Sequence, residues 1–133
     1  MNKIVWTNGC FDILHRGHIE LFKYAKSLGK ILIVGLDEDS RIKSSKGAKR
    51  PVNNLQDRME VLQSIKYIDS VVSFGTDQEL KDQITKNKVQ LIVVGSDYLG
   101  KKVIGSELVQ ETKYFRRIDG YSTTQILQNS SNW

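Results

Sequence analysis

Short apolar runs alternate with segments of helical periodicity along this chain, and this alternation limits most strongly the folds that it can adopt. Four runs rich in β-branched residues and a fifth, weaker one predict strands at Lys3–Thr7, Lys30–Gly35, Ser70–Phe74, Gln90–Gly95 and Lys113–Arg116. The second and fourth runs are continuously apolar, which is typical of strands buried on both faces of a parallel sheet. The pattern predicts an α/β fold with right-handed crossovers between parallel strands.

The segments between these runs carry apolar residues at helical spacing. The predicted helices lie at Ile19–Leu28, Leu55–Ile68, around Leu80 and Ile84, and from Ser122 onward. Gly29 is expected to end the first helix, and Asp77 is expected to cap the third. The sequence shows no internal repeat or linker, so residues 1–133 are expected to form one domain. The expected architecture is a Rossmann-like three-layer sandwich with a five-stranded parallel sheet.

Charge and cysteine content narrow the classes of function. The chain carries a net charge of +5, from 20 basic and 15 acidic residues, and a basic balance suits anionic partners. The densest basic segment, from Arg41 to Arg50, is interpreted as a surface loop. The single cysteine, Cys10, excludes an intrachain disulfide and favours a reducing, cytoplasmic compartment. No stretch is long and apolar enough to cross a bilayer, so no membrane contact is expected.

Several common catalytic motifs are missing from the sequence. The first predicted strand is not followed by G-x-G-x-x-G, and there is no G-x-x-x-x-G-K-S/T phosphate loop. There is no G-x-S-x-G nucleophile elbow. The histidines and the lone cysteine do not have zinc-ligand spacing, so no protein metal site is predicted.

The segment from Thr7 to His18 directly follows the first predicted strand, and ligands of parallel sheets bind at the carboxyl ends of strands. Gly9 allows a tight turn that brings backbone N–H groups close to an anion. A helix is expected to begin near Gly17, and a helix N-terminus is a natural seat for phosphate. His15 and His18, the only histidines, would then lie on roughly the same side.

Paired imidazoles suit nucleotidyl transfer, in which a substrate phosphate attacks the α-phosphorus of a nucleoside triphosphate and pyrophosphate leaves. Charge gathers on the phosphate oxygens, so catalysis depends mainly on positioning and electrostatic stabilisation. Imidazoles can donate hydrogen bonds to those oxygens without acting as nucleophiles. A lone histidine is more often a cap or a packing residue, whereas two at this spacing favour a site.

The sequence His15-Arg16-Gly17-His18, with Gly9-Cys10-Phe11-Asp12 before it, resembles the H-x-G-H signature of the cytidylyltransferase-like nucleotidyltransferases. The resemblance extends over nearly the whole chain. It implies catalytic roles for His15 and His18 and an acceptor-side position for Asp12. It also implies that the nucleoside triphosphate contacts Thr7, Gly9, Cys10, Phe11 and Gly17.

A second signature stands before the last predicted helix. The segment from Arg117 to Thr124 resembles the R-T-E-G-x-S-T-S/T signature of the same family, with departures at Ile118 and Asp119. Taken locally, Gly120 turns the chain and Ser122 caps a helix. By resemblance, Arg117 stabilises the leaving pyrophosphate, and the outer phosphates are bound by Ser122, Thr123 and Thr124.

In this family, lysines after the second strand reach the triphosphate and the acceptor phosphate, which indicates Lys46 first and Lys43 second. The loop from Gly95 to Tyr98 leaves the fourth strand at the ligand edge, and Gly95 and Asp97 are expected to border the nucleotide. Acceptor contacts are expected from Asp37 and Arg58. The alternative for Arg58 is an exposed arginine on a helix.

Two branches of the family compete for the substrate. Arg50–Asn53, Gly95–Tyr98 and Ile104–Ser106 resemble the heptose-phosphate adenylyltransferases, whereas Arg117 and the short chain resemble the glycerol-3-phosphate cytidylyltransferases. More segments favour the first, so ATP and a phosphorylated sugar are expected, with CTP and a phosphorylated polyol as the alternative. Both branches imply Mg²⁺ bound with the triphosphate, a role in cell-surface polysaccharide synthesis and, by resemblance, a homodimer.

A non-catalytic nucleotide-binding sensor is the alternative from another class of function. Such a sensor would be expected to lack His15, His18 or Arg117, and the chain has all three. A nucleic-acid binder would be expected to show a broad basic face with aromatic platforms. Here the basic residues concentrate in one segment and aromatic residues are 8% of the chain, so no nucleic-acid partner is expected.

Overall fold

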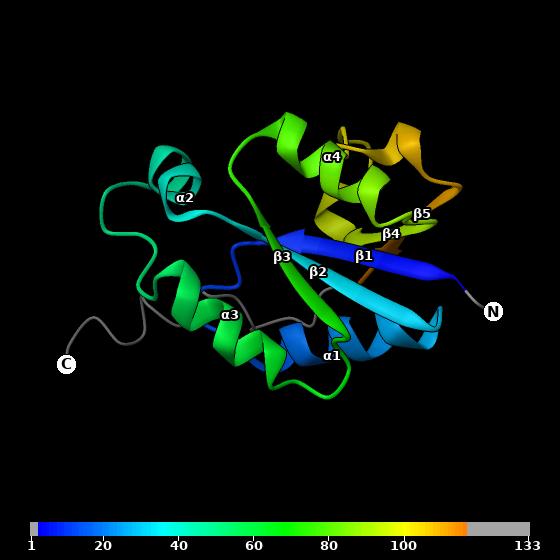
Figure 1. Ribbon diagram of the computed structural model, residues 1–133, viewed down its shortest axis with the longest axis horizontal. Helices are drawn as coiled ribbons and strands as arrows, with labels where there is room; N and C mark the ends of the chain where they lie inside the picture. The colour runs from blue at the N-terminus through cyan, green and yellow to red at the C-terminus, as the bar shows by residue number, and fades with distance from the viewer. Residues whose placement is uncertain (1–2, 117–133) are drawn as a thin grey trace.

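A five-stranded parallel sheet forms the centre of the computed structural model, which describes residues 3–116 (Figure 1). The strands are β1 (Ile4–Gly9), β2 (Ile31–Asp37), β3 (Ser70–Phe74), β4 (Leu91–Gly95) and β5 (Glu111–Phe115). Their order is β3-β2-β1-β4-β5, and each neighbouring pair is parallel. The predicted fold class and the position of each strand are confirmed to within a few residues.

Helices cover both faces of this sheet. They are α1 (Arg16–Ser27), α2 (Asp39–Lys46), α3 (Leu55–Gln63) and α4 (Asp77–Lys86), with short 3₁₀ turns η1 (Ser96–Tyr98) and η2 (Ser106–Leu108). In Figure 1, α1 and α3 lie on one side of the sheet and α4 lies on the other. The result is the expected three-layer arrangement. No helix within residues 3–116 is long and apolar enough to cross a membrane.

Two apolar clusters, one on each face of the sheet, form the core. Val5 and Leu32 belong to the cluster beneath α1 and α3, whereas the next residues along each strand, Trp6 and Ile33, belong to the cluster beneath α4. Successive side chains of a strand point to opposite faces, so a strand covered on both faces must be apolar at every position. This requirement explains the continuous apolar runs in the sequence.

The segment interpreted as a basic loop is partly helical, so that prediction was wrong. Helix α2 occupies Asp39–Lys46, and its single buried residue is Ile42, which is 1% exposed. Gly47 ends the helix with a φ of +100°, a conformation that favours glycine. One buried apolar residue in eight creates no helical periodicity, so the pattern could not show this helix.

Two helix boundaries also differ from the predictions. Helix α3 ends at Gln63, and Ile68 instead packs into the core from the loop that follows. Thr76, rather than Asp77, caps α4, because the Thr76 hydroxyl accepts the Glu79 N–H at 3.1 Å. The predicted helix from Ser122 onward lies outside the described residues.

The strand order creates a switch point beside the central strand. From β1 the chain proceeds outward to β2 and β3 on one side, then returns to place β4 on the other side of β1. The loops that follow β1 and β4 therefore leave the sheet in opposite directions and open a crevice at the carboxyl edge. The two loops that carry most of the predicted site residues meet there.

Candidate active site

A cavity of about 670 Å³ lies at the carboxyl ends of β1 and β4, where the strand order reverses. The predicted site residues that line it are Thr7, Gly9, Cys10, Phe11, His15, Gly17, His18, Asp37, Lys46, Gly95 and Asp97. Among the described residues predicted for the site, three do not line the cavity: Asp12, Lys43 and Arg58. The positions of Arg117, Ser122, Thr123 and Thr124 lie outside the described residues.

The two histidines form a reciprocal cap at the start of α1. His15 is the N-cap, and its Nδ1 accepts the Gly17 N–H at 3.0 Å. In return, Nδ1 of His18 accepts the His15 N–H at 3.2 Å. The rings stack with centroids 3.9 Å apart and planes 28° from parallel. This is the geometry of a capping box, built here from imidazoles in place of the usual hydroxyl and carboxylate.

The reciprocal cap determines which nitrogen of each ring carries the proton. A neutral imidazole that accepts a hydrogen bond at Nδ1 holds its proton at Nε2. Both His15 and His18 accept at Nδ1, so each ring is an Nε2–H donor. Both rings line the cavity, and Nε2 of His15 is itself buried.

The first N–H groups of α1 are already bonded within the helix start, which differs from the expected open phosphate seat. The His15 side chain binds the Gly17 N–H, and the His15 carbonyl binds the His18 N–H at 3.0 Å, so these two groups are satisfied within the turn. No acidic residue lies in the first turn of the helix. The positive end of the helix dipole therefore remains uncompensated.

Phe11 supports the histidine pair from the loop between β1 and α1. Its backbone has a φ of +44°, in the left-handed region that aromatic residues seldom adopt. The Phe11 ring meets His18 edge-on with centroids 5.4 Å apart, and it also contacts Phe22 in the core. A Cβ on Gly9 would come within 3.2 Å of this ring. Gly9 is therefore needed for space beneath Phe11.

Lys46 reaches the cavity from the last turn of α2. Its Nζ lies 3.1 Å from Sγ of Cys10, the residue that follows β1. Lys43, three residues earlier in α2, is exposed and lies outside the cavity lining. Of the two lysines, only Lys46 lines the cavity.

Asp12 and Arg58 are buried, in contrast to their expected contact with an acceptor. The Asp12 side chain is 0% exposed and accepts the backbone N–H groups of Val52 and Asn53 at 2.7 and 2.8 Å. It also pairs with Nε of Arg50 at 3.1 Å. Asp12 therefore holds the segment before α3 against the loop that carries Phe11, and its oxygens face protein donors.

The guanidinium of Arg58 joins four segments beneath the cavity. Its Nη1 donates to the carbonyls of Cys10 and Asp37 at 2.9 and 2.8 Å. Its Nη2 pairs with Asp39 at 2.6 Å, and its Nε donates to the carbonyl of Asn53 at 3.0 Å. The residue is 1% exposed, so both sequence interpretations of Arg58, acceptor ligand and exposed arginine, were wrong. Burial of a charge requires such complete pairing.

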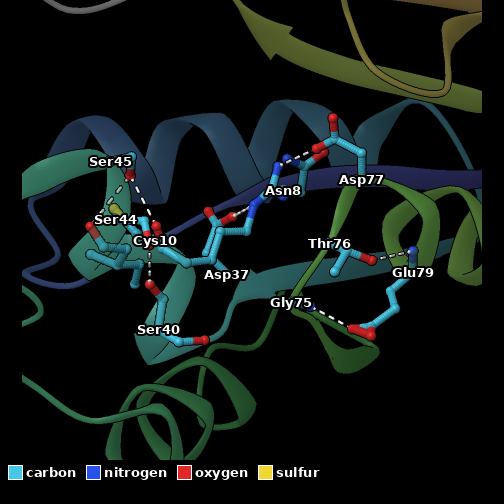
Figure 2. A network of polar contacts seen from close by, with 12 residues as sticks. Asn8, Cys10, Asp37, Ser40, Ser44, Ser45, Gly75, Thr76, Asp77 and Glu79 are labelled. Carbon is cyan, nitrogen blue, oxygen red and sulfur yellow. Dashed lines mark hydrogen bonds and ion pairs between the residues drawn. The ribbon is translucent and has the colours of Figure 1, made fainter.

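Sequence reasoning missed Asn8 and Arg41, which also line the cavity. Arg41 pairs through Nε with Asp37 and through Nη2 with Asp77, both at 2.8 Å (Figure 2). Burial alone would lower the pKa of Arg41, but the hydrogen bonds to Asp77 and Asp37 outweigh it and raise that pKa. Two features of the sequence could have indicated these residues as site residues. Asn8 is next to Gly9, and Arg41 lies in the basic segment.

The comparisons with known proteins agree with this geometry. A family model described as cytidylyltransferase-like matches residues 6–129. Bifunctional protein HldE of Helicobacter pylori (strain J99) is 50% identical over 126 residues, covering 95% of this chain and 27% of that protein. The protein of the same name from Campylobacter concisus is 45% identical, covering 95% of this chain and 26% of its own length. The chain thus matches only a part of these relatives.

Solved structures show the same fold. A lipopolysaccharide core biosynthesis protein from Thermoplasma volcanium superposes with a TM-score of 0.72 at 26% identity, covering 88% of this chain and 98% of that one. A bifunctional NMN adenylyltransferase/ADP ribose pyrophosphatase from Francisella tularensis, complexed with AMP and a manganese ion, superposes with a TM-score of 0.69. It is 18% identical and covers 99% of this chain and 42% of that one, a likeness that shows the fold alone. Since the family model spans nearly the whole chain, this protein belongs to the cytidylyltransferase-like family of nucleotidyltransferases.

Proposed function

We propose that this protein transfers an adenylyl group from ATP to a phosphorylated sugar and releases pyrophosphate. The observation that carries the proposal is the reciprocally capped His15–His18 pair, which lines the cavity at the switch point of the sheet. The choice of ATP and a heptose phosphate is supported by the resemblance at Arg50–Asn53 and by the relatives named HldE.

The reaction itself demands little covalent chemistry from the protein. An oxygen of the acceptor phosphate bonds to the α-phosphorus of ATP, and the bond from that phosphorus to the bridging oxygen of pyrophosphate breaks. The electron pair of the broken bond leaves with pyrophosphate. The attacking phosphate is already anionic at neutral pH, so no general base is needed. What the protein must supply is position and stabilisation of charge.

His15, His18 and Lys46 would supply that stabilisation. The Nε2–H groups of the two imidazoles would donate to oxygens of the α-phosphate, where negative charge grows as pyrophosphate leaves. The ammonium of Lys46 would approach from α2 and offset charge between the acceptor phosphate and the α-phosphate. The rings are held by their caps before substrate binds, so little reorganisation is required during the reaction.

The apolar side of the cavity suits the base of the nucleotide. Val94, Val103, Ile104 and Phe115 line the cavity on the side of β4 and β5. An apolar surface beside a few polar groups is the usual lining of a small-molecule site. Gly95 and Asp97 lie in the same wall and would border the ribose or the base.

A divalent ion would enter this site with the nucleotide. No group of three or more histidine, cysteine or acidic side chains in residues 3–116 has the arrangement of a metal site. Mg²⁺ bound by triphosphate oxygens and waters needs no such group. When bound, the ion neutralises part of the charge on the phosphates. We propose Mg²⁺ as the physiological ion.

Other parts of the proposal rest on the resemblance to the family. Arg117, Ser122, Thr123 and Thr124 would bind the outer phosphates of ATP, and Arg117 would stabilise the leaving pyrophosphate. Lys43 would assist at longer range. We also propose that the protein acts as a homodimer in the cytoplasm, where sugar nucleotides for cell-surface polysaccharides are made.

A pyrophosphate-release assay tests the proposed function. ATP and CTP are each combined with D-glycero-D-manno-heptose 1-phosphate and with glycerol 3-phosphate, in the presence of Mg²⁺. The highest kcat/KM is expected for ATP with the heptose phosphate. Faster release from CTP with glycerol 3-phosphate would indicate a cytidylyltransferase instead. Nucleotide binding without release from any pair would indicate a non-catalytic sensor.

A further inference from the structure

A second set of polar side chains lines the cavity on the side of β1 and β2, away from the apolar wall. It consists of Asn8 at the end of β1, Asp37 at the end of β2, and Arg41 in the first turns of α2. Figure 2 shows Asn8, Asp37 and Asp77 in one region, and Arg41 joins Asp37 to Asp77 at the start of α4. We refer to Asn8, Asp37 and Arg41 as the diol cluster, for the reason argued below.

The amide of Asn8 has a defined orientation. Its Oδ1 accepts the indole N–H of Trp6 at 2.9 Å. Trp6 is 0% exposed, and its ring lies over Gly35, where an added Cβ would meet it at 2.4 Å. The indole is thus closely packed, and its N–H can only donate. This contact assigns oxygen to one end of the amide and leaves Nδ2 as the donor end.

The guanidinium of Arg41 is also fixed before any ligand binds. Asp37 accepts from Nε and Asp77 accepts from Nη2, and the guanidinium carbon lies 5.3 Å from the centre of the Phe74 ring. Within residues 3–116, neither Nη1 of Arg41, Nδ2 of Asn8 nor Oδ2 of Asp37 has a hydrogen-bond partner. The cluster thus offers N–H donors and a carboxylate acceptor at one wall of the cavity.

The charge at the cluster indicates what it binds. Within the cluster the charges of Arg41 and Asp37 cancel, and Asp77, which also pairs with Arg41, brings the local sum to −1. A phosphate placed there would meet net repulsion, and the guanidinium is already paired. A hydroxyl group both donates and accepts, so it can donate to Asp37 while it accepts from Asn8 or Arg41. We propose that the diol cluster binds hydroxyl groups of the sugar acceptor and is a specificity determinant for polyhydroxylated phosphates.

The position of the cluster favours the acceptor over the ribose of ATP. The apolar wall suited to the base lies on the β4 and β5 side of the cavity, whereas the cluster lies at the ends of β1 and β2, on the other side of the switch point. Arg41 and Lys46 are five residues apart on α2, or about 7.5 Å along the helix axis. A sugar phosphate can span that interval, with its phosphate toward Lys46 and its hydroxyls toward Arg41.

Two isosteric variants test the inference, which rests on the proposed sugar-phosphate adenylyl transfer. Asn8→Asp keeps an oxygen for the Trp6 indole but removes the amide donor. Asp37→Asn keeps an acceptor for Arg41 but removes the charge that binds hydroxyls. Each variant is expected to raise the KM for the heptose phosphate by about tenfold or more, as for a lost hydrogen bond to a charged group. The KM for ATP should change by less than about twofold, within the range of an unrelated surface substitution.

The direction in which Asp37→Asn changes the acceptor KM distinguishes a cluster that binds hydroxyl groups from one that binds phosphate. If the cluster binds phosphate, removal of a negative charge must lower the acceptor KM and strengthen inhibition by inorganic phosphate, and either result would overturn the inference. A rise in the KM for ATP without a rise for the acceptor would assign the cluster to the ribose and would also overturn it. Asp82→Asn, on the exposed face of α4 with Gln78 as its partner, is the matched control.

The two proposals fail in different ways. If the unmodified protein releases no pyrophosphate from ATP and any sugar phosphate, the proposed function fails. If the unmodified protein turns over but both variants keep its acceptor KM, only the diol cluster is refuted. Thermal unfolding of each variant, measured beside the kinetics, shows that a changed KM comes from a folded protein.

Discussion

His15 and His18 have a structural role at Nδ1 and, in the proposed reaction, a chemical role at Nε2. Nδ1 of each ring closes the cap of α1, which leaves the proton on Nε2, the atom that the proposal assigns to the phosphate. Folding of the helix start therefore also orients the two rings. Substitutions must separate these roles if they are to test the chemistry.

Replacement of His18 by glutamine makes that separation. Glutamine at the third helical position is an ordinary member of a capping box, and its Oε1 can accept the His15 N–H as Nδ1 does now. We predict that His18→Gln lowers kcat by about 100-fold or more, the usual cost of one lost donor to a developing anion. The free energy of unfolding should fall by less than about 1 kcal/mol, as for a modified cap. Pyrophosphate release and thermal unfolding measure the two effects, and near-normal turnover in this variant or in His18→Ala would remove His18 from the mechanism.

Lys46 and Lys49 offer a comparison within one basic segment. Lys46 lines the cavity and contacts Cys10, whereas Lys49 is exposed and outside the lining. We predict that Lys46→Ala lowers kcat/KM by about tenfold or more, because a cation near the reacting phosphates is lost, and that Lys49→Ala changes it less than about twofold. Equal effects in the same assay would show that the structure does not distinguish the two lysines in the reaction.

At the scale of elements, the site depends on how α2 and α3 are attached to the carboxyl edge of the sheet. Helix α2 has only Ile42 in the core, so most of its attachment is polar. Arg58 of α3 binds Asp39 at the start of α2 and the carbonyl of Asp37 just before it. The position of Lys46 therefore depends on a residue of another helix that does not touch the cavity.

Arg58→Met should show this dependence as a loss of stability. Methionine fills similar space but leaves the carbonyls of Cys10, Asp37 and Asn53 without their donor. We predict that the free energy of unfolding falls by about 3 kcal/mol, as when one member of a buried network is removed. Arg58→Lys should not restore it, because an ammonium cannot reproduce the planar fork. Urea denaturation gives both values, and Arg16→Met, at a side chain 71% exposed, is the control expected to change little.

At the scale of the whole molecule, the two ends of the strands have different roles. The cavity lies at the carboxyl ends, whereas Asp69 holds neighbouring elements together at the amino ends. Its Oδ2 binds Nζ of Lys26 at 2.6 Å and the N–H of Leu32 at 2.8 Å, which joins the end of α1 to the starts of β2 and β3. Burial alone would raise the pKa of Asp69, but the hydrogen bonds to Lys26 and Leu32 lower it below its ordinary 3.8.

This shift predicts a dependence of stability on pH. The folded state holds the Asp69 carboxylate more strongly ionised than the unfolded chain, so its contribution is complete above the unfolded pKa near 4 and is lost as pH falls through the lower folded pKa. The side chain is 40% exposed, so the contribution should be about 0.5 kcal/mol. Urea titrations of the unmodified protein and Asp69→Asn should differ by this amount at pH 7 and converge near pH 3. A constant difference across that range would refute the ionic contribution.

The sequence by itself determined the elements whose signals are local. Continuous apolar runs indicated the strands, because a strand covered on both faces needs apolar residues at every position. Gly9 and the spacing of His15 and His18 indicated the loop at the end of β1, because these residues lie within twelve consecutive positions of the sequence. The parallel order of strands then placed these signals at one edge of the sheet.

Only the tertiary structure decided the roles of residues that act across the chain. Arg58 meets Cys10 across 48 positions, and Arg41 meets Asp77 across 36, so neither partnership leaves a local pattern. The same is true of α2, whose helical state depends on a single buried isoleucine and on neighbours from other elements. Periodicity reports which face of a segment is buried, whereas the partner of a charge depends on which strands the fold brings side by side.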